Sequence, residues 1–411
     1  MRLAAVSLLI LTLIASASLA GVAPGSLLIY YGWPSGINGT FAVTAAAAEF
    51  AAYDDVVLGD GLELATHPDH ANTVAIIAQV HATATTRVFG YIDLGVSTQN
   101  FTLAEIGLRV DAWQATGADG VFFDDFGYDF QVTRARQNAA VALAHARGLP
   151  VVANGWNPDD VFGAAIDPVA NPDGAPTALG AGDFYLSESF QVAIGEYQDE
   201  AAWFAKAEAV AAYRAQLGFD VLAVTTNDAA NAYDAAKFAY AWYSALLCGY
   251  ASVGWGEHLF AATTGVAPYR ERPAEAPGST FLSGIFAESP VYSRATDQGW
   301  VIIDAASHNG DFAPGAAAAD EAPGWDVQLG AAPNPFNPRT SISFRLPGPS
   351  LVRFEVFTLS GRRVATLVAG VPYAAGAHTL FLDGEGLPSG VYLGRLTTDA
   401  GVATCRLSLV H

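Results

Sequence analysis

Two short apolar segments of the sequence end in carboxylates that could carry out acid–base or nucleophilic chemistry. Gly120–Asp125 is apolar until Asp124 and Asp125, and Asp183–Glu188 is mostly apolar until it closes in Glu188. A buried parallel strand delivers acids in this way to the carboxyl-terminal end of a barrel, where the active sites of such barrels lie. Two carboxyl groups, one donating a proton and one attacking or stabilising the sugar, are what glycoside hydrolysis requires.

We predict Asp124 and Glu188 as this catalytic pair. Their alternative role is structural, because acids at strand ends also cap helices or bind arginines. Their position on the functional face of a barrel favours catalysis, while Asp125 is expected to support the pair or to cap a helix. A retaining mechanism needs carboxyls about 5 Å apart and an inverting one roughly 6.5–9.5 Å, and the sequence leaves that distance open.

The elements that must position these acids follow a repeating pattern between Leu27 and His258. Short apolar runs alternate with alanine-rich amphipathic stretches, which is typical of βα units around a parallel sheet. The eight predicted strands are Leu27–Trp33, Asp55–Gly61, Arg87–Leu94, Gly120–Asp125, Pro150–Trp156, Asp183–Glu188, Asp220–Asn227 and Tyr250–Glu257.

Helical stretches fall between most of these strands. They include Thr102–Thr116, Val132–Ala146, Ala201–Leu217 and Ala232–Leu247, and Gly148 and Gly218 mark two returns to the sheet as C-cap glycines do. Eight such units predict an α/β fold, a (β/α)8 TIM barrel. A doubly wound open sheet is the alternative, but no glycine-rich phosphate motif follows the first strand.

Other predicted strand ends carry aromatic, amide and acidic side chains suited to a saccharide cleft, because aromatic faces stack on sugar rings and polar groups bond hydroxyls. Each tryptophan could equally pack at the mouth of the barrel. The candidate substrate-binding residues are Tyr31, Trp33, Tyr91, Asp93, Asp125, Asn154, Trp156, Asn227, Trp255 and Glu257. No cysteine and histidine spacing matches a metal site, so we predict neither a metal nor another cofactor.

Composition indicates a globular protein with a large core and an acidic surface. The chain has 411 residues, 52% of them hydrophobic, and a formal net charge of −21. Such a charge would repel nucleic acid and anionic membranes and suits a neutral or cationic substrate. The two lysines, Lys206 and Lys237, stand among many arginines and alanines, which we attribute to genome composition rather than to mechanism.

Residues 1–20 have the pattern of a secretory signal peptide. Arg2 precedes the apolar stretch Val6–Ile14, and small residues lead to Ala20. A membrane anchor is the alternative, but the apolar stretch is too short to span and no later segment is apolar for long enough, so no transmembrane segment is expected after signal removal. Cys248 and Cys405 lie in separate predicted domains and indicate buried thiols rather than a disulfide framework.

The chain changes character after the barrel. We predict a hairpin within Phe281–Ile303 as an appendix to the barrel, which makes 21–308 one domain, and a linker over 309–330 that is rich in Ala, Gly, Pro and acids. Short alternating strands then predict a small β-sandwich over 331–411. Its strands are Ser341–Leu346, Val352–Phe357, Val364–Val368, Gly376–Leu382, Gly390–Leu396 and Ala403–Val410.

Four barrel segments taken in order resemble a known family. Phe89–Gly95, Gly117–Asp125, Ala153–Trp156 and Ser187–Phe190 look like the barrel of glycoside hydrolase family 114, which contains endo-α-1,4-polygalactosaminidases and spherulin-4-like proteins. The resemblance covers roughly Leu27 to Trp255. It implies Asp124 as nucleophile and Glu188 as acid/base. The family usually has Asn where this chain has Asp125, and a second carboxylate there could raise a pKa in the pair.

The last domain resembles a different group. Asn334–Pro338, Phe357–Arg362 and Leu387–Tyr392 look like the C-terminal sorting domain of type IX secretion, which is related to the Ig-like domain of flagellar hook-capping proteins. The resemblance implies export by bacterial secretion machinery, followed by release or by attachment to the outer-membrane surface. A β-sandwich spacer without any address function is the alternative.

These observations give two expectations about function. The first is a secreted, endo-acting glycoside hydrolase that cleaves an extracellular polysaccharide rich in amino sugars through Asp124 and Glu188. We expect its mechanism to retain the anomeric configuration. The second is a non-catalytic carbohydrate-binding surface protein that keeps the barrel and uses its acids only to hold sugar or a cation. Asp125 in place of Asn is the best support for the second.

Overall fold

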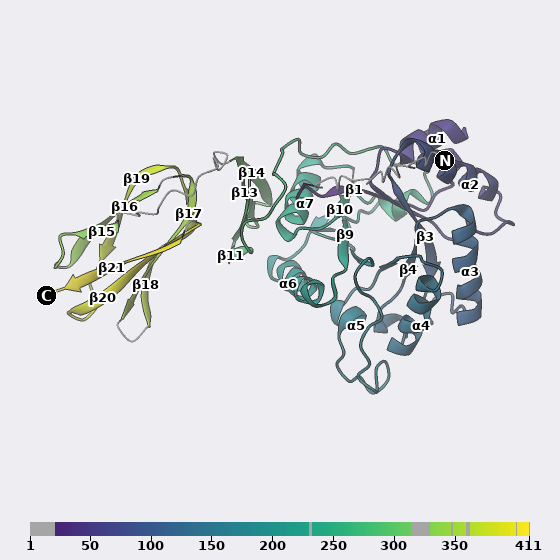
Figure 1. Ribbon diagram of the computed structural model, residues 1–411. Helices are drawn as coiled ribbons and strands as arrows, with labels where there is room; N and C mark the ends of the chain where they lie inside the picture. Colours follow the sequence, from purple (N-terminus) through teal and green to yellow (C-terminus); the bar gives the residue numbers. More distant parts are fainter. Residues whose placement is uncertain are drawn as a thin grey trace, which may run out of the picture.

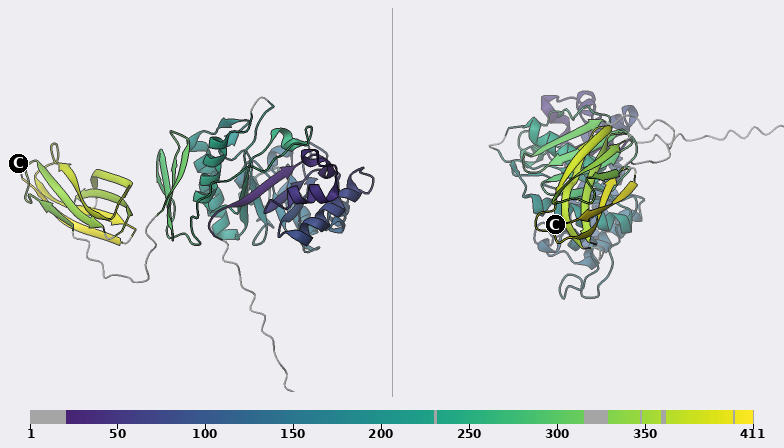
Figure 2. Two further views of the ribbon diagram at one scale, coloured as in Figure 1. Left: turned by 90° about the horizontal axis from the view of Figure 1, so that it is seen from above. Right: turned by 90° about the vertical axis from the view of Figure 1, so that its left-hand side faces the viewer.

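The structure, a computed structural model, describes residues 21–229, 232–314, 329–346, 348–358, 362–399 and 401–410. The predicted signal peptide lies outside these ranges, as does most of the predicted linker. Along the chain a closed barrel is followed by an antiparallel sheet and then by a β-sandwich (Figures 1 and 2). Within the described residues, no helix is long and apolar enough to cross a membrane.

Eight parallel strands close into a barrel, in which every strand pairs with its neighbours in chain order and the last pairs with the first. The prediction of a (β/α)8 barrel is confirmed and the doubly wound sheet is excluded. All eight predicted strands form, but each ends one to three residues earlier than predicted. The strands are β1 (Gly25–Tyr30), β2 (Asp55–Leu58), β3 (Arg87–Asp93), β4 (Gly120–Asp124), β5 (Val151–Ala153), β6 (Phe184–Ser187), β9 (Asp220–Val224) and β10 (Ser252–Gly254).

Helices cover the outside of the barrel (Figure 1). The first residues of α3 are fixed by a capping box, in which Thr102 and Glu105 bond each other's backbone N–H groups, and Gly117 ends the helix in the left-handed conformation. The helices are α1 (Val43–Phe50), α2 (His70–Thr83), α3 (Leu103–Thr116), α4 (Arg134–His145), α5 (Pro158–Phe162), α6 (Glu200–Leu217) and α7 (Ala235–Cys248), with short 3-10 turns η1 (Pro34–Gly39), η2 (Tyr128–Phe130) and η3 (His258–Ala261).

Two apolar layers hold the barrel together, because successive strand residues point alternately inward and outward. Leu27, Ile29 and Phe122 belong to the cluster that fills the interior. Leu28, Val121 and Trp113 belong to the larger cluster between the strands and the helices. The interior is therefore a packed core, and any ligand must bind at one of its ends.

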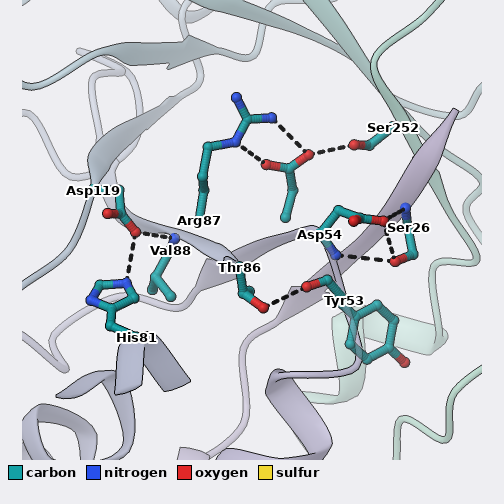
Figure 3. Close-up of polar contacts among 10 residues, drawn as sticks. Ser26, Tyr53, Asp54, His81, Thr86, Arg87, Val88, Asp119 and Ser252 are labelled. Atoms are coloured by element: carbon teal, nitrogen blue, oxygen red, sulfur yellow. Dashed lines mark hydrogen bonds and ion pairs between the residues drawn. The ribbon is translucent and has the colours of Figure 1, made fainter. Parts of the chain in front are cut away.

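The amino-terminal end of the barrel is closed by a network of paired polar groups (Figure 3). Asp55, fully buried at the start of β2, accepts two hydrogen bonds from the guanidinium of Arg87 at 2.7 and 3.1 Å and one from the hydroxyl of Ser252. Asp54 accepts from the backbone N–H and hydroxyl of Ser26. These bonds join β1, β2, β3 and β10 where the strands begin.

The same device recurs around this end of the barrel. Asp119 accepts a hydrogen bond from the backbone N–H of Val88, the second residue of β3, and also contacts the imidazole of His81 at 2.9 Å (Figure 3). Asp183 repeats the pattern with Val151 of β5 and with His145. In both cases, an acid just before one strand bonds the start of the neighbouring strand and a histidine on the helix that leads into that neighbouring strand.

An antiparallel sheet of four strands follows the barrel and packs on α7 through β13 and β14. The predicted hairpin is confirmed as β12 (Val291–Thr296) and β13 (Gly299–Asp304), flanked by β11 (Phe286–Glu288) and β14 (Asn309–Pro314). The predicted linker over 309–330 therefore started too early, because 309–314 form β14. Its alanine, glycine and proline content hid a strand that pairs along the whole of β13.

The C-terminal region is a β-sandwich, as predicted, made of sheets β15-β16-β19 and β18-β17-β20-β21. Alternate residues of the facing sheets form one core that includes Ile342, Phe354 and Leu396. All six predicted strands form, and a seventh, β15, precedes them. The strands are β15 (Leu329–Ala332), β16 (Arg339–Leu346), β17 (Ser350–Thr358), β18 (Arg363–Tyr373), β19 (Gly376–Asp383), β20 (Gly390–Thr398) and β21 (Gly401–Leu409).

Candidate active site

The two predicted catalytic acids lie at the carboxyl-terminal end of the barrel, at the ends of β4 and β6. Asp124 is the last residue of β4 and Glu188 follows the last residue of β6. The residue after each acid turns the chain sharply, because Asp125 and Ser189 have positive φ angles of 53° and 55°. Non-glycine residues seldom adopt this conformation and hold it where the surroundings enforce it, often at functional sites.

Asn154 joins the two acids. It follows β5, the strand that lies between β4 and β6 in the barrel. Its side-chain nitrogen Nδ2 donates one hydrogen bond to Oδ1 of Asp124 at 2.8 Å and another to Oε2 of Glu188 at 2.7 Å. One amide with two N–H groups therefore uses both of them to hold the pair.

These bonds fix how far apart the carboxyls can be. Both oxygens lie within 2.8 Å of a single nitrogen atom, so they cannot be separated by more than twice that distance. The two N–H bonds of an amide diverge by about 120°, which places the oxygens about 5 Å apart. The two bridged oxygens therefore lie at a separation close to the carboxyl spacing of about 5 Å in retaining glycosidases, and shorter than the roughly 6.5–9.5 Å of inverting ones.

Asp124 has more hydrogen-bond donors than Glu188. Besides Asn154, it receives the backbone N–H of Asp125 at 2.9 Å and the hydroxyl of Tyr91. Tyr91 is itself held in place, since its carbonyl accepts the indole N–H of Trp113 at 2.9 Å. Trp113 can lie so close to β3 because residue 90 is glycine; a Cβ there would be 2.0 Å from the indole ring.

Burial raises the pKa values of the acids at this end of the barrel. It raises the pKa of Asp124 to about 6, with a further contribution from the charge of Glu188, while the three donors act in the opposite direction. Burial also raises the pKa of Glu188, against the effects of Asn154 and Lys206. A carboxyl whose pKa is raised above its ordinary value is better suited to hold and donate a proton.

Asp125 lies beside the pair and faces the loop after β3. Burial, followed by the charges of Asp124 and Asp93, raises its pKa to about 7, while the nearby Thr98 acts in the opposite direction. Asp93 is buried and accepts bonds from the N–H of Gly95 and the hydroxyl of Thr98. Asp93 therefore shapes the loop that contacts Asp125, rather than lining the pocket as the sequence predicted.

A pocket of about 330 Å³ contains the acids. This volume is in the range of small-molecule sites. Of the substrate-binding residues predicted from sequence, Asp125, Asn154 and Trp156 line it, and Trp156 is 60% exposed at its rim. The full lining is Asp124, Asp125, Asp129, Phe130, Asn154, Gly155, Trp156, Glu188 and Lys206.

Tyr31 and Tyr91 lie beneath this pocket, in edge-to-face contact with each other at 5.4 Å between ring centroids. Burial, then the charge of Asp124, raises the pKa of both hydroxyls. These two predicted residues are therefore close to the acids, although they support the pair from inside the barrel.

The other predicted substrate-binding residues do not line this pocket. Trp33 is 56% exposed and contacts His67, and Asn227 donates to the carbonyl of Gly256. Trp255 is buried against Phe238 and Tyr233, and Glu257 is ion-paired with Arg270 at 2.6 Å. A strand-end position decides that a residue is near the mouth of a barrel but not the direction in which its side chain points.

Lys206 is the main pocket residue that the sequence did not reveal. It comes from the outer helix α6, yet its ammonium nitrogen lies 4.7 Å from the ring centroid of Trp156 and 5.8 Å from that of Tyr185. The chain has only two lysines, and this rarity could have pointed to Lys206 as a functional residue, but from the sequence alone we attributed it to genome composition. Asp129 and Phe130, in η2 just after β4, were also missed.

A larger cavity, about 770 Å³, lies between α6 and the antiparallel sheet. Its two arginines are already engaged, since Arg214 donates to the carbonyl of Gly249 and Arg294 to that of Leu247, at the end of α7. It contains no pair of acids. Across the parts of the chain that the structure describes, no group of three His, Cys, Asp or Glu side chains is arranged to hold a metal ion, and Cys248 and Cys405 are free thiols.

Comparisons with known proteins place this chain in no established group. No known family matches it, and no curated protein does. Dihydropteroate synthase of Xanthomonas albilineans is one solved structure that matches, at 16% identity over 60% of this chain and 90% of that one, with a TM-score of 0.34. The YdjI aldolase of Escherichia coli K12 matches at 15% identity over 58% of this chain and 76% of that one, with a TM-score of 0.33. Malate synthase of Haloferax volcanii matches at 11% identity over 61% of this chain and 72% of that one, with a TM-score of 0.36. Similarity this distant assigns no activity to the chain.

Proposed function

We propose that this protein is a secreted glycoside hydrolase that cleaves an extracellular polysaccharide by an endo-acting, retaining mechanism. The observation that carries the proposal is the bridge from Asn154 to both Asp124 and Glu188, which keeps one oxygen of each carboxyl about 5 Å apart, close to the carboxyl spacing of retaining glycosidases. The resemblance of the barrel segments to glycoside hydrolase family 114 makes galactosamine-containing polymers the first substrates to test.

In the proposed reaction, Asp124 attacks the anomeric carbon of the sugar while Glu188 donates its proton to the departing glycosidic oxygen. Water then hydrolyses the glycosyl ester on Asp124, with Glu188 taking the proton back. The donors support these roles, because three hydrogen bonds favour the ionised form of Asp124. Glu188 accepts one bond, from Asn154, and its burial favours the protonated form.

The test is hydrolysis by the Asp124→Asn and Glu188→Gln variants. Each should lower the release of reducing ends from galactosaminogalactan-type or bacterial exopolysaccharides by about 10³-fold or more, because each removes a group that acts in the transition state. Asp220→Asn is a matched control, since Asp220 is a half-exposed acid at the amino-terminal end of β9, ion-paired with Arg214. Turnover close to wild type in either active-site variant would refute the assignment.

A carbohydrate-binding protein without catalytic activity is the second candidate. The feature that favours it is the third carboxylate, Asp125, whose pKa is also raised and which would add charge beside the nucleophile. This alternative predicts that wild-type protein binds the polysaccharide and releases no reducing ends from it. Detection of a glycosyl-enzyme ester on Asp124 by mass spectrometry would exclude it.

We further propose export by type IX secretion, with the sandwich of 329–411 as the sorting signal and 1–20 as the signal peptide. The support is the three ordered motifs in the last domain. In a host that has this machinery, a chain ending before residue 329 should remain in the periplasm, while the full chain should reach the medium or the outer-membrane surface. Equal export of both chains would leave the sandwich a spacer.

A further inference from the structure

Lys206 differs from the other described cations of the barrel in having no hydrogen-bonding partner, although the charge of Glu188 favours its protonated form. Each described arginine between residues 21 and 314, and also Lys237, donates to a carboxylate or a carbonyl oxygen. The ammonium group of Lys206 makes no hydrogen bond and no ion pair with any described residue. Its contacts are the ring faces of Trp156 and Tyr185.

This ammonium group belongs to the pocket of the acid pair, beside Glu188 and Trp156. Lys206 is partly buried, so its ammonium group loses some of its hydration, and aromatic faces offset that loss only in part. Burial lowers the pKa of Lys206 to about 8, so most molecules still carry the charge at neutral pH. Three N–H donors are therefore available to a ligand in this pocket.

We propose that Lys206 determines specificity by selecting a sugar unit that presents a neutral oxygen acceptor, such as the carbonyl of an N-acyl group, and by rejecting one that presents a free ammonium. This inference rests on the proposed function and narrows its substrate to N-acylated hexosamine polymers. An amide carbonyl accepts a bond from the lysine, whereas a second ammonium group beside it would meet a like charge.

The overall charge argues for a neutral acceptor rather than a carboxylate on the sugar. The chain carries a formal net charge of −21, and the pocket that contains Lys206 is also lined by Asp124, Asp125, Asp129 and Glu188. A polyanion would be repelled before it reached that lysine. An N-acylated sugar avoids both the repulsion by the acids and the repulsion by Lys206.

The test compares α-1,4-linked galactosamine oligosaccharides in two forms, N-acetylated and free amine, by kcat/KM and by calorimetric binding to the full-length protein. Wild type should prefer the N-acetylated form by about tenfold or more. Lys206→Gln, which removes the charge and keeps a donor, should reduce this ratio to near unity, mainly by improving use of the free amine. Lys237→Gln is the matched control and should keep the wild-type ratio, because Lys237 bonds the carbonyl of Gly195 outside the pocket.

Several outcomes would overturn the proposal. An unchanged ratio in a folded Lys206→Gln variant would show that the lysine does not read this group, and failure of wild type to bind either form would exclude hexosamine polymers. Tighter binding of an oligogalacturonate, lost in Lys206→Gln, would identify an anionic substrate instead. Binding that follows the predicted ratio without any hydrolysis would support the role of Lys206 while refuting the proposed catalysis.

Discussion

The two ends of the barrel use the same kind of side chain in opposite ways. At the amino-terminal end, Asp55 lies among groups that complete its hydrogen bonding, with a guanidinium on one side and a hydroxyl on the other. At the carboxyl-terminal end, Asp124 and Glu188 share a single neutral amide, and burial raises their pKa values. A carboxylate that is bonded to a cation stabilises the strands, whereas carboxyls that are bonded only by neutral donors keep raised pKa values that suit proton transfer.

The difference follows from what surrounds each end. Arg87 and His81 reach the strand starts, and both bond acids there. At the strand ends, the pocket offers Asn154, aromatic rings and one lysine that bonds neither acid. Removing one partner from a buried ion pair costs several kcal/mol, but removing a carboxylate whose charged form is already disfavoured costs little stability.

Asn154→Ala should give the largest effect at the carboxyl-terminal end. It removes the donor that positions both acids, so we expect kcat to fall by about 10²- to 10³-fold, the usual cost of losing one transition-state donor. The midpoint of thermal unfolding should change little, because the released carboxyls can accept protons instead. Parallel assays of reducing ends and thermal unfolding measure both. A large loss of stability with unchanged kcat would reverse the comparison between the two ends.

Asp55→Ala should give the complementary result at the amino-terminal end. It leaves Arg87 and Ser252 without their acceptor and should lower the free energy of unfolding by about 3 kcal/mol. The activity of each folded molecule should stay at the wild-type level, since the site lies at the far end of the strands. Urea unfolding and active-site titration separate the two quantities. Asp220→Asn, which breaks a more exposed pair, should cost about 1 kcal/mol or less.

Asp125→Asn should shift the pH dependence of kcat/KM. Asp125 loses its proton through a pKa of about 7, and its charge then raises the pKa of Glu188. Without that charge, the limb of the profile that reports Glu188 should move to lower pH, by about one unit or less. Asparagine tolerates the positive φ at this position, so the turn should persist. A pH profile that does not move would mean that the charge of Asp125 does not affect the pKa values of the catalytic acids.

The same variant should change how stability depends on pH. Because folding raises the pKa of Asp125 above its unfolded value, its contribution to stability is fully present below about pH 4 and is lost as the pH rises through about 7. The unfolding midpoint of wild type should therefore fall more steeply between pH 4 and pH 8 than that of Asp125→Asn. Equal slopes would contradict the raised pKa.

Deleting residues 329–411 should have the smallest effect. The contact of the sandwich with the preceding sheet consists chiefly of Leu351 packed with Trp300 and Ala295. Exposing these side chains should lower the unfolding midpoint of the barrel by about 3 °C or less, which corresponds to about 1 kcal/mol. Calorimetry of the full and shortened chains gives the shift. A loss above 10 °C would show that the sandwich is part of the barrel's own core.

The sequence predicted the fold more completely than the site. Alternation of apolar strands and amphipathic helices is a local signal, and all eight barrel strands and six sandwich strands follow it. The position of Asp124, Glu188 and Asn154 at consecutive strand ends was also readable, because order around the barrel is order along the chain. β14 was missed since its pairing with β13, not its composition, makes it a strand.

The direction of side chains was not readable. Trp255 and Glu257 follow β10 as Asn154 follows β5, yet they point toward Phe238 and Arg270 rather than toward the acids. Lys206 shows the reverse case, in which a residue of an outer helix extends into the pocket. Such orientations depend on long-range packing that no local pattern encodes.

The single amide of Asn154 has a consequence for the stereochemistry of the product. The Asn154 side chain, just after β5, holds both acids and so sets the distance between them. That distance decides whether water attacks the sugar directly, as in inversion, or only after a covalent intermediate has formed, as in retention. Asn154→Leu keeps most of the side-chain volume and removes both N–H groups, so we expect it to free the acids to move apart and to favour products of inverted anomeric configuration. In a barrel of this kind, a single substitution at the end of the strand between the two acids would therefore distinguish enzymes whose products have opposite anomeric configurations.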